Sequence, residues 1–176
     1  MRTPLHSRFL VTAALAGLVM VVPAAPAHAE ILVTQTRTDG AVFGGATYLV
    51  DFNGGAAGGT QFTFETAGPN RRVIIMFNAE CAHQGVTTNY VDIDILVDPA
   101  GPSAEAAIAP SNGDNAFCSG NGTTTGGDTF LLDGWTSVAT VATVMLPQAG
   151  THTVRIRLDG RSSVTRLDDM SLVVFR

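Results

Sequence analysis

Two runs of residues at the end of the chain constrain its fold most strongly. Between Gln148 and Phe175 the sequence reads QAGTHTVRIRLDG, a polar turn, and then TRLDDMSLVVF. Apolar and polar residues alternate in both runs, which is the period-two pattern of β-strands with one face toward solvent. Ala149-Gly150 and Asp159-Gly160 are residues typical of turns. We therefore predict two strands that form an antiparallel pair, joined by Arg161-Ser162-Ser163, and that close a sheet.

The rest of the chain repeats this pattern in short runs separated by turn residues. Apart from the N-terminal segment, no window has apolar residues at the 3.6-residue spacing of a helix. We predict strands at Ile31–Arg37, Ala46–Phe52, Gln61–Thr66, Arg72–Ala79, Tyr90–Val97 and Trp135–Leu146, and a short strand or a single helical turn at Ala104–Ala109. The continuous apolar run RVIIMFNA (72–79) predicts a central strand buried on both sides. Roughly eight to ten short strands predict an all-β protein, a single antiparallel β-sandwich of jelly-roll type.

The first 29 residues have the organisation of a secretory signal peptide. Arg2, His6 and Arg8 give a basic start, and the apolar run Phe9–Val22 is short for a bilayer span, which takes about 20 residues, so a signal peptide is favoured and a membrane anchor is the alternative. Ala27-His28-Ala29 places small residues at the two positions that a signal peptidase reads. We expect residues 1–29 to be removed and residues 30–176 to form one secreted domain, either extracellular or in the periplasm or at the cell surface.

The charge of the mature chain excludes several classes of partner. All 15 acidic residues lie beyond the leader, against the eight arginines that remain once Arg2 and Arg8 are removed, a net charge of −7 (8 − 15). Such a chain repels nucleic acid and acidic lipid, so we expect neither nucleic-acid binding nor membrane insertion. An extracellular glycan or a protein surface is the expected partner, and an oligomer is compatible with this composition.

Cys81 and Cys118 are the only cysteines of the chain. In an exported protein, two cysteines without metal-ligand spacing predict one disulfide, with two free thiols or a pair of metal ligands as the alternatives. The predicted bridge ties down the loop 111–128, which is the longest irregular region and is rich in Asn, Gly and Thr.

The stretch GTHTVRIRLDG followed by RLDDMSLVV resembles the end of jelly-roll modules in secreted bacterial proteins, such as carbohydrate-binding modules and galactose-binding-like domains. The resemblance covers about thirty residues and implies the sandwich more than the function. In several such families an acidic residue near the last strand holds a structural calcium, which here implies Asp168 or Asp169 as ligand. Sugar-binding faces usually expose several aromatic residues, whereas this chain has one Trp and two Tyr, which argues against binding of flat polysaccharide.

We expect a binding site where the long loop meets the strand ends. Loop amides and carboxylates offer both donors and acceptors to hydroxyl-bearing ligands, and a disulfide would hold them in place before binding. The candidate contacts are Asp114, Asn115 and Asn121 in the loop, Glu80 and His83 near Cys81, and Trp135 as a stacking surface. Apart from the calcium that the resemblance implies, we expect no cofactor. Asp92 and Asp94 share one face of a strand, either as calcium ligands or as an ordinary solvent-facing pair.

No residue pattern indicates catalysis. Glu80, His83 and His152 are the only plausible acid–base set, and the chain lacks the Gly-x-Ser-x-Gly turn of hydrolases. We therefore expect a secreted, non-catalytic recognition module for glycan or another extracellular ligand. The alternative is a structural or surface-interaction protein, such as an oligomeric coat or matrix component; a flat apolar face or an unprotected edge strand would favour it.

Overall fold

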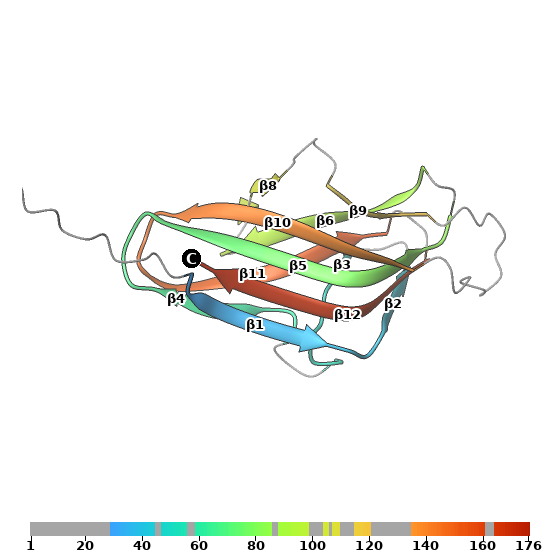
Figure 1. The fold of residues 1–176 in the computed structure, drawn as a ribbon, viewed down its shortest axis with the longest axis horizontal. Helices are drawn as coiled ribbons and strands as arrows, with labels where there is room; N and C mark the ends of the chain where they lie inside the picture. The colour runs from blue at the N-terminus through green and yellow to red at the C-terminus, as the bar shows by residue number, and fades with distance from the viewer. Residues whose placement is uncertain are drawn as a thin grey trace, which may run out of the picture.

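The computed structural model describes residues 29–44, 47–55, 59–85, 88–98, 104–105, 107–109, 115–120, 135–160 and 164–176. Within these ranges the chain forms twelve β-strands and no helix, arranged as two antiparallel sheets packed face to face (Figure 1). The all-β sandwich predicted from the alternating pattern is confirmed. Its assignment to the jelly-roll type stays a prediction. Residues 1–28 of the predicted signal peptide lie outside the described ranges.

We call the first sheet sheet A. It contains β1 (Ile31–Arg37), β2 (Ala41–Gly44), β5 (Arg71–His83), β8 (Ala107–Ala109), β10 (Thr136–Leu146) and β12 (Val164–Phe175). The order is β1-β12-β5-β10-β8, and β2 pairs with the part of β12 that β1 leaves free. The three longest strands, β12, β5 and β10, therefore lie side by side at the centre (Figure 1).

Sheet B contains the other six strands. These are β3 (Thr47–Leu49), β4 (Phe62–Thr66), β6 (Tyr90–Val97), β7 (Ala104–Glu105), β9 (Ala116–Ser119) and β11 (Gly150–Asp159). The order is β3-β11-β6-β7, with β4 also beside β11 and β9 also beside β6. The inward residues of both sheets form one apolar core, in which the Phe77 ring of β5 lies 5.2 Å from that of Phe117 on β9 and 6.2 Å from that of Phe52.

The predicted pairing of the last two strands is wrong. β11 lies in sheet B, between β6 on one side and β3 and β4 on the other, whereas β12 lies in sheet A, between β5 and the β1/β2 edge. The chain therefore crosses from one sheet to the other after Asp159. The alternation of each run correctly predicts a strand with one buried face, but it does not specify which strand takes the neighbouring hydrogen-bonding edge.

The prediction for the apolar run 72–79 is half right. β5 is central in sheet A, but only its inward residues Val73, Ile75 and Phe77 are fully buried, and the alternate residues Ile74 and Met76 are only partly covered. The run looks like a strand buried on both sides because its outward residues are apolar too. No strand that the structure describes lies over this outer face, which is turned toward the viewer in Figure 1.

Other strand boundaries differ locally from the predictions. β2 was not predicted, the predicted strand 46–52 is limited to β3, and β5 continues beyond its predicted end at Ala79 as far as His83. Within the predicted loop 111–128, residues 116–119 form β9 and pair with β6. Cys118 is therefore part of a strand, which the bridge to β5 and the packing of Phe117 in the core hold in place.

Candidate functional site

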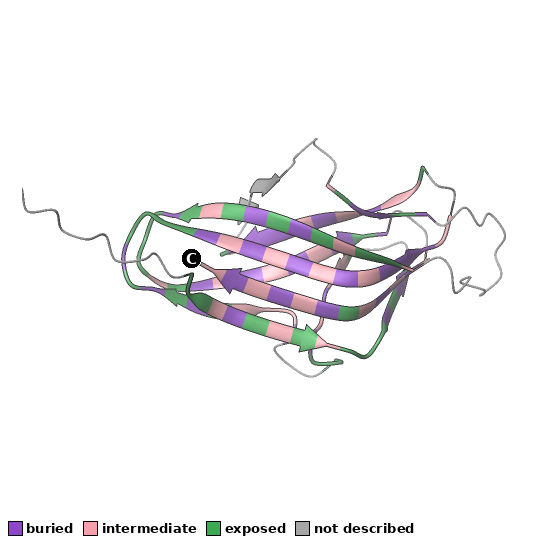
Figure 2. Cartoon of the chain, viewed as in Figure 1, coloured by how far each residue is buried: buried purple, intermediate pink, exposed green. Residues whose placement is uncertain are grey.

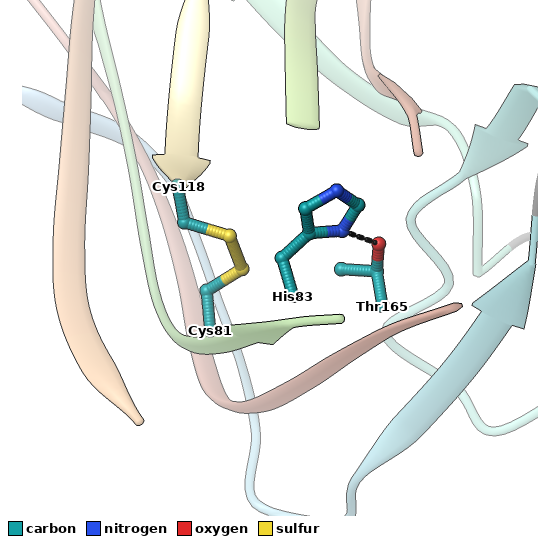
Figure 3. Close-up of a disulfide and its surroundings, with 4 residues drawn as sticks. All are labelled: Cys81, His83, Cys118 and Thr165. Atoms are coloured by element: carbon teal, nitrogen blue, oxygen red, sulfur yellow. Dashed lines mark hydrogen bonds between the residues drawn. A yellow bond between two sulfur atoms is a disulfide. The ribbon is translucent and has the colours of Figure 1, made fainter. Parts of the chain in front are cut away.

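The disulfide predicted from the two cysteines is present. Cys81, near the end of β5, is joined to Cys118 on β9 with a Cα–Cα distance of 6.3 Å (Figure 3). Thr136, the first residue of β10, pairs with Cys81 in the register of sheet A, so Trp135 lies at the same end of the sandwich. Of the predicted loop contacts, Asp114 and Asn121 lie outside the described residues.

His83 and Glu80 do not belong to one site. His83 is 0% exposed, and its Nδ1 lies 2.8 Å from the hydroxyl oxygen of Thr165 on β12 (Figure 3). Its other ring nitrogen is buried without a hydrogen bond from any described residue. Burial lowers the pKa of His83 below its usual range. Since side chains alternate along β5, Glu80 points outward and His83 inward, and only Glu80 can meet a ligand at the surface.

Asn115 lies on sheet B and does not join Glu80 either. Its backbone N–H donates to Asp92 Oδ1 at 2.9 Å, and its carbonyl oxygen accepts from the N–H of Ile93 at 2.9 Å. Asp94, on the same face of β6 as Asp92, is paired with Arg157 of β11 at 2.6 Å. These contacts attach the start of β9 to sheet B, so Asp92 and Asp94 have structural partners on the solvent face.

The predicted acid–base set is separated as well. His83 lies at the end of β5, whereas His152 lies at the opposite end of the sandwich, near the start of β11. His152 Nδ1 is 2.7 Å from Asp98 Oδ2, and its Nε2 is 3.1 Å from Thr66 Oγ1. This order of carboxylate, imidazole and hydroxyl matches a hydrolytic triad. Thr66 is only 3% exposed, however, so a substrate carbonyl cannot reach its oxygen. These hydrogen bonds instead join three elements of sheet B.

Glu80 and Asp169, nominated separately from the sequence, line one hollow on the outer face of sheet A. Its volume is about 360 Å³, and its polar lining consists of Asn78 and Glu80 from β5, Ser137 from β10 and Asp169 from β12. We call this the bulge hollow. Small apolar residues of β5 and β10 complete its wall. The hollow thus combines two carboxylates with an amide and a hydroxyl at the surface.

A β-bulge in β12 shapes this hollow. Asp168 pairs with Glu80 and Ser171 pairs with Asn78, so β12 has one residue more than β5 between these two pairs. Asp169 takes a φ of +44°, a left-handed conformation that is uncommon for residues other than glycine, although Asp tolerates it better than most. Bulges and such backbone conformations are enriched at functional sites because they redirect a side chain. Here the bulge presents the Asp169 carboxylate to the hollow.

The calcium site implied at Asp168 and Asp169 stays a prediction. Oδ1 of Asp168 accepts the N–H of Asp169 at 2.9 Å, and Asp168 lies beside Glu80 in the register of sheet A. Among the described residues, no group of three or more His, Cys, Asp or Glu side chains is arranged to hold a metal ion.

Next to the bulge hollow, the outer face of sheet A is apolar. The register places Val141, Met76 and Val173 in one row across β10, β5 and β12, and Ile74 beside Phe175 in the next row. With Met145 these residues form what we call the apolar stripe. Met145 is 51% exposed and Val141 38% exposed, and the remaining members are partly exposed (Figure 2). The solvent face of an antiparallel sheet is normally polar, so the apolar stripe departs from the usual pattern.

The outer face of sheet B shows the normal pattern. Along β11 its outward residues include Thr153, Arg155 and Arg157. Arg155 Nε donates to Gln61 Oε1 at 2.9 Å, and Arg157 is paired with Asp94. The outward face of β11 therefore carries no such stripe.

Comparison with models of known protein families gives no match, and a sequence search of curated proteins finds no significant relative. The resemblance of the closing strands to carbohydrate-binding modules therefore rests on those residues alone. Among the described residues, no helix is long and apolar enough to cross a membrane.

Proposed function

We propose that this chain is an exported, non-catalytic binding protein whose contact surface is the outer face of sheet A. The observation that carries the proposal is the apolar stripe, which runs across the three central strands of a face that no described strand covers. Export is supported by the signal-peptide pattern and by the disulfide between Cys81 and Cys118, which persists in oxidising compartments. A non-catalytic role is supported by the separation of Glu80, His83 and His152.

The chemistry of the face defines the partner that it would bind. The stripe favours an apolar surface of similar flatness, because burying it removes apolar area from water at about 25 cal/mol per Å². The adjoining bulge hollow favours a hydrogen-bond donor or a cation, because Glu80 and Asp169 present carboxylate oxygens. A partner that carries a donor or positive charge beside an apolar patch satisfies both halves of the face.

A glycan is the second candidate, and the bulge hollow together with Trp135 favours it. Trp135 precedes Ser137 by two residues, which places both side chains on the same face of an extended strand. Sugar hydroxyls would donate to Glu80 and Asp169 while a sugar ring stacks on the half-buried indole. If the partner is a glycan, the apolar stripe has no assigned role, so we rank the glycan second.

The test compares variants of the two outer faces. Val141→Lys with Val173→Lys places two charges in the stripe of sheet A, and Thr153→Lys places a charge on the outer face of sheet B as a control. Each protein, with its fold checked by circular dichroism, is examined on a glycan array and by light scattering for self-association. We expect binding of either kind to be lost in the sheet A variant and kept in the control. Binding that survives in the sheet A variant would refute the proposed surface.

A further inference from the structure

We propose that the partner of this face is a second copy of the chain, docked face to face with its β5 antiparallel, so that Arg72 of each copy enters the bulge hollow of the other. The inference rests on the proposed function, because it uses the same face, and it adds the identity and the orientation of the partner. Interfaces between two identical chains related by a two-fold axis are the commonest in soluble oligomers.

The order of residues along the outer side of β5 carries the inference. The outward side chains are Arg72, Ile74, Met76, Asn78 and Glu80 in sequence, so the strand is basic at one end, apolar in the middle and acidic at the other. A two-fold axis that lies between the sheets, perpendicular to β5 and over Met76, reverses the strand of the partner. Each Arg72 then lies over the other copy's Glu80, and the two Met76 side chains meet on the axis.

The same charges disfavour a face-to-face arrangement with parallel strands. A two-fold axis parallel to β5 would keep the two strands parallel and would place Arg72 over Arg72 and Glu80 over Glu80. Asp168 and Asp169 would add to the repulsion at the acidic end, because Asp168 lies beside Glu80 in the register. Opposing like charges across an interface disfavour a docking mode, so the charge pattern selects the antiparallel one over the parallel one.

The bulge hollow suits a guanidinium group in both size and chemistry. Its volume of about 360 Å³ leaves room for the end of an arginine side chain. Glu80 and Asp169 supply carboxylate oxygens, and a guanidinium offers five N–H donors in a fixed plane, which makes charge-assisted pairs of this type strong. Within the described chain, neither Arg72 nor Glu80 forms an ion pair, so both are available to a partner.

The size of the face predicts the strength of the dimer. From residue 72 to residue 80 the strand is about 27 Å long, and the three strands β10, β5 and β12 are about 14 Å across, which gives roughly 400 Å² of flat area. A standard stable interface buries about 800 Å² on each partner. We therefore expect a dimer that forms at high protein concentration and dissociates on dilution.

Sedimentation equilibrium of the protein purified after export, over a range of concentrations, tests this arrangement. We expect a reversible dimer that Arg72→Glu and Glu80→Arg each weaken at least about tenfold, since each substitution opposes like charges. The combined variant Arg72→Glu/Glu80→Arg exchanges the two charges and should restore the dimer. Glu65→Arg makes the same charge change on the outer face of sheet B and should leave the dimer unaffected.

A chain that stays monomeric at every concentration, or a dimer that the single charge reversals do not weaken, would overturn the inference. The two proposals fail differently. If the wild-type protein is monomeric and binds a glycan that the Val141→Lys/Val173→Lys variant no longer binds, the face binds a different partner and only the dimer is refuted. If a dimer persists in that variant as well, both the dimer arrangement and the proposed surface are refuted.

Discussion

Removal of the Cys81–Cys118 bridge should cost a large part of the stability of this sandwich. The two cysteines are separated by 37 positions, and closing a loop of that length in the unfolded chain corresponds to about 4 kcal/mol on the chain-entropy model. Both side chains are buried, at 1% and 5% exposure, and the neighbouring Phe117 packs on Phe77 in the core. We expect the double variant Cys81→Ala/Cys118→Ala to lose about 2–5 kcal/mol of unfolding free energy.

Guanidinium unfolding of wild type and double variant, followed by tryptophan fluorescence and far-UV circular dichroism, measures this loss. The double variant is preferred to Cys81→Ser because it leaves no free thiol. Intact-mass analysis after thiol alkylation of the native wild type provides the control, with neither cysteine modified. A loss below about 1 kcal/mol would refute the reasoning, because the bridge would then contribute less than its loop-closure entropy. Two alkylated cysteines in the native protein would refute the bridge itself.

Three further predictions concern single side chains. Burial lowers the pKa of His83, so just below the ordinary value of 6.5 the unfolded state binds more protons than the folded state. The free energy of unfolding should therefore fall as the pH drops through that range, by at most about 1.4 kcal/mol per pH unit. His83→Gln should make this fall less steep, as measured by urea unfolding at several pH values. An equally steep curve in the variant would contradict this. Asp169→Gly should raise the melting temperature by removing a left-handed strain of about 1 kcal/mol, and a lowered melting temperature would show that the bulge is not strained. Asp98→Ala leaves Nδ1 of the buried His152 without its partner and removes the acceptor for the N–H of Thr153, so it should cost about 1–3 kcal/mol in urea unfolding, and an unchanged midpoint would contradict the role of this contact.

Local patterns predicted the strands well because a half-buried strand requires alternation wherever it lies. The limits of β1 and of β6 agree with the sequence to the residue. What alternation cannot specify is the neighbour of a strand or the number of layers. The last two strands were paired wrongly because alternation does not specify the neighbour of a strand. The outer face of β5 was predicted to be buried because the sequence pattern does not specify the number of layers.

The second of these errors concerns the proposed binding face itself. Ile74 and Met76 have the composition of a strand covered on both sides, yet no described strand covers them. Apolar strand residues beyond those that the chain's own sheets bury support the proposed interface, and the run 72–79 contains such residues.

The bulge hollow also had a sequence signal that was missed. Leu167 and Met170 are both buried, at 0% and 1% exposure, although residues three apart on a regular strand face opposite sides. The pair Asp168-Asp169 between them therefore indicated an extra residue in the strand. Glu80 and Asp169 were each nominated for other reasons, and only the register of β5 and β12 brings them to one place.

Cysteine cross-linking at the centre of the face tests the central claim most directly. In the antiparallel arrangement Met76 lies on the two-fold axis, so Met76→Cys places two thiols opposite each other, whereas Thr153→Cys places a thiol on the outer face of sheet B. Sheets packed face to face lie about 10 Å apart, which is farther than a direct disulfide can span, so the thiols are joined with a short bismaleimide at high protein concentration. We predict that Met76→Cys then gives a covalent dimer on denaturing gels and that Thr153→Cys stays monomeric. Absence of a Met76→Cys dimer, or equal cross-linking of both variants, would contradict the account.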